Sequence, residues 1–136
     1  QAKEEAERKR KIANQEAMEQ QRRDSTLLNT YSNEAEIDQA LERSQVLVNA
    51  RIDSNKMLLK SSQSALDELK KEAESRTKTG KKIPQSLTND IAQREARVVK
   101  YNAELARNEE ELAAVKTRFQ KEKELYRKLK AGNSKK

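Results

Sequence analysis

Clusters of acidic side chains are the feature of this sequence that most resembles an acid–base pair. Glu109, Glu110 and Glu111 are consecutive, and Glu68 lies one helical turn before Glu72. A catalytic carboxylate needs a pocket that shifts its pKa toward the working pH. The flanking sequence predicts thin helices without such a pocket, so we interpret both clusters as solvated helix faces. We therefore expect a chain that is not an enzyme and has no catalytic residue.

The residue types needed for metal or cofactor chemistry are missing. The chain has no Cys and no His, which excludes the usual zinc sets, thiol nucleophiles and imidazole bases. The segment TGKK at 79–82 resembles the end of a phosphate-binding loop, but it lacks the first Gly, the Ser or Thr and a preceding strand. Two Gly residues cannot form a dinucleotide fingerprint. We expect no metal, no cofactor and no small-molecule substrate.

The composition excludes a thick globular core. Of 136 residues, 33% are hydrophobic and 39% charged, which leaves a disordered chain or long helices with a narrow apolar seam. Two segments show the heptad spacing of a coiled coil, with steps of four and three. The seam positions of the first are Leu41, Gln45, Val48, Ile52, Asn55, Leu59, Ser62, Leu66, Leu69 and Ala73. Those of the second are Leu87, Ile91, Arg94, Val98, Tyr101, Leu105, Asn108, Leu112, Val115, Phe119, Glu122, Tyr126 and Leu129.

The segment between the two heptad repeats predicts a tight turn. It holds Gly80, which can end a helix, and Pro84, which suits the first turn of the next one. Folding back at Gly80 keeps the two seams in phase, which a flexible linker has no reason to do. The opposed pairs are then Leu69 with Ile91, Leu66 with Arg94, Leu59 with Tyr101, Val48 with Leu112 and Leu41 with Phe119. A slip of one heptad remains an open alternative.

A second helix start is predicted near Asn33. Asn33 is followed by Glu36, the pattern of a helix cap with its capping-box partner. We therefore predict an all-α fold: a charged N-terminal helix over 1–31 and an antiparallel coiled-coil hairpin over 32–136. The hairpin consists of a helix over 33–78, a turn over 79–84, a helix over 85–131 and a basic tail over 132–136.

Two surfaces are candidates for binding a protein partner. The last helix outlasts the middle one, so its end needs cover from the N-terminal helix, which predicts a small three-helix knot. The knot residues are Leu27, Leu28, Tyr31, Tyr126 and Leu129. The other candidate is the hairpin tip, formed by Lys78, Lys81, Lys82 and Ile83.

Polar residues dilute the predicted seam and favour a partner. They are Gln45, Asn55, Ser62, Arg94, Asn108 and Glu122. A two-helix hairpin with such a seam barely offsets the entropy of ordering, so we expect it to form a homodimer or to dock on another protein. The polar positions are interpreted as register control, with a polar binding site as the alternative.

The net charge of +7 supports a rival function. The excess lies in the turn and the C-terminal third, and its tail residues are Lys128, Lys130, Lys135 and Lys136. Such a tail could bind nucleic acid or an anionic membrane surface. Stacking aromatics are scarce and the charges before Gly80 are balanced, so we favour solvated charge over that alternative. A chaperone-like clamp, which requires exposed apolar surface, is a weaker third interpretation.

Three pieces of the sequence carry a resemblance to a known group of proteins. They are LLNTYSNEAEID, the Gly-Lys-x-x-Pro turn at 80–84, and RFQKEKELYRKL. Together they resemble the helical C-terminal portion of uncharacterised secreted or periplasmic proteobacterial proteins. In that group a signal peptide and a small Cys-containing segment precede the helices, so the resemblance implies a mature or trimmed fragment and a periplasmic or secreted location. The group brings no known activity. We expect a structural or adaptor protein of the cell envelope.

Overall fold

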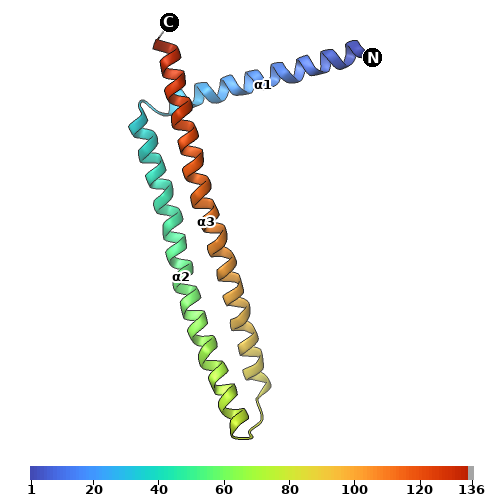
Figure 1. Ribbon diagram of the computed structural model, residues 1–136, viewed down its shortest axis with the longest axis vertical. Helices are drawn as coiled ribbons and strands as arrows, with labels where there is room; N and C mark the ends of the chain where they lie inside the picture. The colour runs from blue at the N-terminus through green and yellow to red at the C-terminus, as the bar shows by residue number, and fades with distance from the viewer. Residues whose placement is uncertain (135–136) are drawn as a thin grey trace. The chain divides into compact units, whose positions relative to one another are not determined.

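The computed structural model describes residues 1–134 as three α-helices (Figure 1). They are α1 (Ala2–Thr30), α2 (Glu34–Lys78) and α3 (Gln85–Ser134). Helices α2 and α3 pack as an antiparallel hairpin, and α1 contacts α3 weakly. The predicted all-α hairpin with an N-terminal charged helix is confirmed. We predicted that the last helix ends at residue 131, but α3 continues to Ser134. Gly132 does not end the helix, because the residues that follow it keep the helical conformation up to Ser134.

Two compact units divide the chain, and the division crosses both hairpin helices. The first unit comprises Gln1–Glu42 and the chain from Lys116 onward, and the second is Arg43–Val115. Each unit holds a stretch of α2 and a stretch of α3.

The turn between α2 and α3 is set by Gly80. Its φ of 72° lies in the left-handed region, which Gly adopts without a steric penalty. The N–H of Lys81 donates to the carbonyl of Arg76 at 2.8 Å, and the N–H of Gly80 donates to that of Thr77 at 3.2 Å. These two bonds form a Schellman motif, which satisfies carbonyls at the end of α2. Pro84 stands directly before α3, where its carbonyl accepts the N–H of Thr88 at 3.2 Å.

The predicted seam is the interior of the hairpin. Every predicted seam position on both helices is buried or half-buried. The buried members of the second unit are Val48, Ile52, Ser62, Leu66, Leu87 and Asn108, and those of the first are Phe119 and Tyr126. Ile37, which also lies in the first unit, is 1% exposed. The heptad pattern therefore identified the core, its polar members included.

Cross-helix ion pairs fix the register of the hairpin. In the second unit Arg51 Nη2 lies 2.9 Å from Glu111 Oε1, and Lys70 Nζ lies 3.7 Å from Glu95 Oε1. Glu111 directly precedes Leu112, and Arg51 lies one turn after Val48, the residue that the predicted register opposes to Leu112. The observed register agrees with this opposition, so the one-heptad slip does not occur.

Candidate functional site

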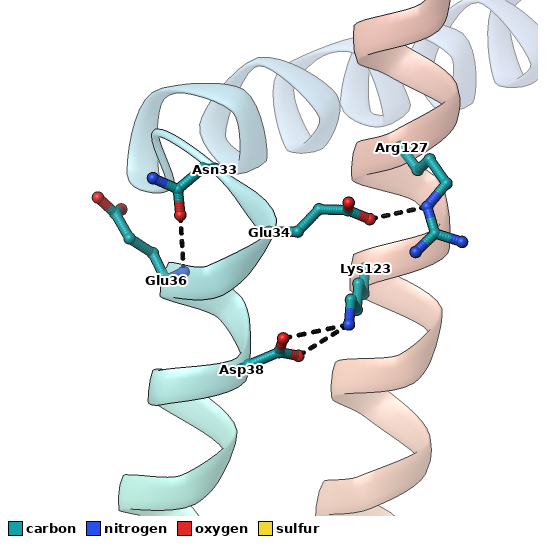
Figure 2. A network of polar contacts seen from close by, with 6 residues as sticks. All are labelled: Asn33, Glu34, Glu36, Asp38, Lys123 and Arg127. Atoms are coloured by element: carbon teal, nitrogen blue, oxygen red, sulfur yellow. Dashed lines mark hydrogen bonds and ion pairs between the residues drawn. The ribbon is translucent and has the colours of Figure 1, made fainter.

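A cap orders the chain where it enters α2 (Figure 2). Asn33 Oδ1 accepts the N–H of Glu36 at 3.0 Å. Glu36 Oε2 in turn accepts the N–H of Ser32 at 2.9 Å. Both bonds satisfy backbone donors that the start of a helix would otherwise leave without partners. The predicted pairing of Asn33 with Glu36 is therefore confirmed, although the Glu36 side chain reaches Ser32 and not Asn33 itself.

Two ion pairs join α2 to α3 beside this cap. Lys123 Nζ lies 3.1 Å from Asp38, and Arg127 Nε lies 2.8 Å from Glu34 Oε1 (Figure 2). All four side chains are at least one-third exposed, so each pair contributes on the order of 0–1 kcal/mol. Their main effect is to align the start of α2 with the last turns of α3.

The predicted knot residues lie in the first unit and are mostly covered. Leu27 and Tyr126 are buried, whereas Leu28, Tyr31 and Leu129 are half-buried. Leu27 and Tyr31 line an open hollow together with Glu122 and Leu125 of α3. The end of α1 therefore does approach α3, as predicted. Because most of this apolar surface is already covered within the chain, the knot offers a partner little area.

The predicted tip residues all remain accessible. Lys78, Lys81, Lys82 and Ile83 are exposed, and Ile83 is 43% exposed. Lys78 Nζ lies 3.2 Å from Glu74 of its own helix. The turn thus presents positive charge around one apolar side chain, and it stays a candidate contact.

The predicted basic tail is only partly described. Lys128 and Lys130 are exposed on α3, and Lys130 Nζ lies 5.6 Å from the ring centre of Tyr126. Lys135 and Lys136 lie outside the described residues. The two exposed lysines are two residues apart on α3 and therefore point to nearly opposite sides of the helix, so by themselves they make a weak anionic-ligand site.

The acidic side chains of the two clusters lie at the surface of their helices. Glu109 and Glu110 are exposed, Glu111 pairs with Arg51, and Glu72 lies 3.5 Å from Arg76 of its own helix. Within residues 1–134, three or more potential metal ligands nowhere gather closely enough to hold an ion. Over the same residues, none of the helices has the length and apolar character needed to cross a membrane.

An exposed apolar face on α2 was missed by the sequence analysis. Val46, Leu47, Met57 and Leu58 are 61%, 65%, 73% and 43% exposed. Small exposed residues lie between and after them on the same side of the helix. We call this surface the outer face of α2, and its members are Val46, Leu47, Ala50, Ser54, Met57, Leu58, Ser61 and Ser64. A second heptad stripe on the side of α2 away from the seam was the signal that could have found it.

No protein-family model, curated protein or solved structure matches the chain. The surfaces of the chain that could bind a partner are therefore the hairpin, the tip, the described part of the tail and the outer face of α2. Of these, the outer face has the most exposed large apolar side chains, four along one helix, whereas the tip has one, Ile83.

Proposed function

We propose that this chain is a non-catalytic structural or adaptor protein of the cell envelope that acts through coiled-coil contacts with protein. The observation that carries the proposal is the outer face of α2. Four large apolar side chains stand in solvent along one helix, within the second unit. Exposed apolar residues are common singly, but a row of them marks an interaction surface.

The energetics favour covering this face. Burying a large apolar side chain is worth roughly 1.5–3 kcal/mol relative to leaving it in water. The side chains of Leu47 and Met57 are each about two-thirds or more exposed, so a partner could recover most of that value at both positions. Ala50, Ser54 and Ser61 between and beside them allow another backbone to come close. A helix is the partner that such a surface fits.

The seam supports the same proposal from inside the hairpin. Ser62 and Asn108 are buried at seam positions where an apolar residue would stabilise more. Asn108 Nδ2 has no hydrogen-bond partner among the described residues, and a buried amide left unpaired costs on the order of 1–3 kcal/mol. A hairpin with these costs gains from a partner that adds apolar contact elsewhere.

The envelope location rests on the sequence resemblance described above. The pieces that carry it are in the segments 27–38, 80–84 and 118–129. The first and third meet in the first unit, where the cap and the two ion pairs align α2 with α3. The first and third pieces therefore have a structural role here, and the location itself is part of the proposal.

Cross-linking in the source organism tests the proposed function. The chain is cross-linked in cells, purified under nuclease treatment and examined by mass spectrometry for what accompanies it. We expect one recurrent protein at near-equal amount, retained through moderate salt. Met57→Glu should abolish the capture, while Val99→Glu, on α3 at 69% exposure, should leave it intact.

Two other outcomes would overturn the proposal. Neighbours that depend on nucleic acid or lipid, and that disappear when salt is raised or the tail lysines are removed, would favour the anionic-surface function. A broad mixture of unfolded proteins bound at the apolar face would favour the clamp. In the first case Met57→Glu and Val99→Glu would capture equal amounts of these neighbours. In the second case the captured proteins would be many and variable, which contradicts one recurrent partner.

A further inference from the structure

The outer face of α2 has the spacing of a second coiled-coil seam. Its central row alternates steps of three and four, and every member of the row is exposed: Leu47, Ala50, Ser54, Met57, Ser61 and Ser64. Continuing the same spacing in each direction reaches Arg43 at one end and Glu68 at the other. A heptad row is what another helix packs against, so the occupant of this face is a helix lying along α2.

The charges at the two ends of the row select the direction of that helix when it is a second copy of α2. In an antiparallel pair Arg43 faces Glu68 of the second copy, and two-fold symmetry repeats the pair at the other end. A parallel pair would instead place Arg43 beside Arg43 and Glu68 beside Glu68. Opposite charges at facing positions favour the antiparallel arrangement and oppose the parallel one.

Side-chain sizes along the row favour the same arrangement. Antiparallel pairing in this register sets Leu47 against Ser64, Ala50 against Ser61, and Ser54 against Met57. Each large side chain then meets a small one, as closely packed helices require. Parallel pairing would stack Leu47 on Leu47 and Met57 on Met57, and it would leave gaps where Ser meets Ser.

The border of the row is complementary as well. Asp53 and Lys60 lie along one side of it, and the antiparallel register brings Asp53 of each copy near Lys60 of the other. Arg43, Asp53, Lys60 and Glu68 are all exposed. None of them makes an ion pair with another residue of the described chain, so all four side chains are available across an interface.

We propose that two copies of this chain pair antiparallel through the outer face of α2, with the two-fold axis between Ser54 and Met57. The inference deepens the proposed function, on which it rests, by naming one coiled-coil partner as a second copy of the chain. The whole interface lies within Arg43–Val115, the second compact unit. It leaves the hairpin seam and the tip unused.

Cysteine pairing tests the register directly, because the chain contains no Cys of its own. Ala50→Cys and Ser61→Cys are each exposed, conservative changes. Under mild oxidation, the two variants mixed should form a mixed disulfide dimer. Each variant alone should stay unlinked, because like positions would then be displaced by about 16 Å along the helix, at ~1.5 Å per residue. Lys56→Cys lies beside the axis but off the face, and it should remain unlinked in every mixture.

Sedimentation of the purified chain provides the second measurement. The unmodified chain should sediment as a dimer, and Leu47→Glu with Met57→Glu should convert it to a monomer with unchanged helical circular dichroism. Both sites are exposed, so these substitutions leave the hairpin seam intact. Val99→Glu is the matched control, an equally exposed apolar residue on α3, and it should remain a dimer.

Each contrary result overturns the self-pairing. Disulfides within Ala50→Cys alone would show parallel pairing, and dimers that fail only with Val99→Glu would place the interface on α3. A monomeric wild-type chain, together with no mixed disulfide between the two Cys variants, would reject self-association. The proposed function would still stand if such a monomer captured a different protein in cells through Met57, and it would fall separately if no protein were captured.

Discussion

Arg51 of α2 and Glu111 of α3 bind one another across the hairpin, with Arg51 Nη2 and Glu111 Oε1 2.9 Å apart. Both side chains are well exposed, and they flank an open hollow that also holds Asn55 and Asn108. The pair lies beside the most polar layer of the seam. The ion pair therefore helps to set the register of α2 against α3 in the part of the seam where apolar packing contributes least to it.

The first prediction concerns the strength of this pair. A double-mutant cycle with Arg51→Ala and Glu111→Ala should give a coupling energy of about 0.2–1 kcal/mol, the range for exposed pairs. Because both groups are in contact with solvent, the coupling should shrink toward zero near 1 M salt. Urea unfolding at low and high salt measures it. A coupling that is large and insensitive to salt would contradict the solvated pair described here.

The second prediction concerns the buried amide of Asn108. Asn108→Leu should raise the free energy of unfolding by about 1–3 kcal/mol, because it removes a buried amide group without a partner. Asn102→Leu, at an exposed position on the same helix, should change it little. Urea midpoints compare the two. A destabilised Asn108→Leu would mean that the amide is satisfied in solution.

The third prediction concerns the turn. Gly80→Ala should lower the free energy of unfolding by about 1–2 kcal/mol, because Ala is strained at a φ of 72°. No atom lies within 4 Å of the added Cβ, so backbone conformation is the only cause. Gly132→Ala, which also meets nothing within 4 Å but lies in α3, should be neutral or stabilising by about 0.5–1 kcal/mol. Equal effects at the two positions would rule out the left-handed turn.

The fourth prediction concerns Tyr126. Its ring is 3% exposed, and its hydroxyl is buried without a hydrogen-bond partner in residues 1–134. Tyr126→Phe should therefore leave the thermal midpoint unchanged or raise it, whereas Tyr126→Ala should cost about 3–5 kcal/mol as a large cavity opens. Calorimetry of both variants separates the ring from the hydroxyl. A marked loss with Phe would reveal a hydrogen bond to that oxygen.

The seam was predictable because its physical signal is periodic. Each of its positions sits at a heptad step, and even Ser62 and Asn108 were placed in the core by spacing alone, against their polarity. The turn was predictable for a similar reason, since Gly80 and Pro84 have conformations that few other residues share. At these sites the conformational preference of the residues and the heptad spacing predict the same structure, and such agreement is what specifies a fold.

The outer face was not predicted because its heptad row contains few large apolar residues. Leu47 and Met57 alternate there with Ala and Ser, so the row has the spacing of a seam but a fraction of its apolar area. Sequence spacing also cannot tell an exposed Leu from a buried one, and only the exposure of the side chains in the folded structure separates the two stripes on α2. The end of α3 was misjudged because Gly132 stops a helix only where the next residues turn, and here they do not.

The Schellman turn at Gly80 has a consequence for how the hairpin assembles. Contacts next to the turn close short loops, while the contact of Asp38 with Lys123 closes a loop of 85 residues. Because loop-closure entropy grows with length, the chain should zip from the turn outward and close the cap region last. Amide hydrogens would then exchange most slowly near Leu66 and Leu87 and fastest around Ile37. The end of the hairpin that closes last is the end that carries α1.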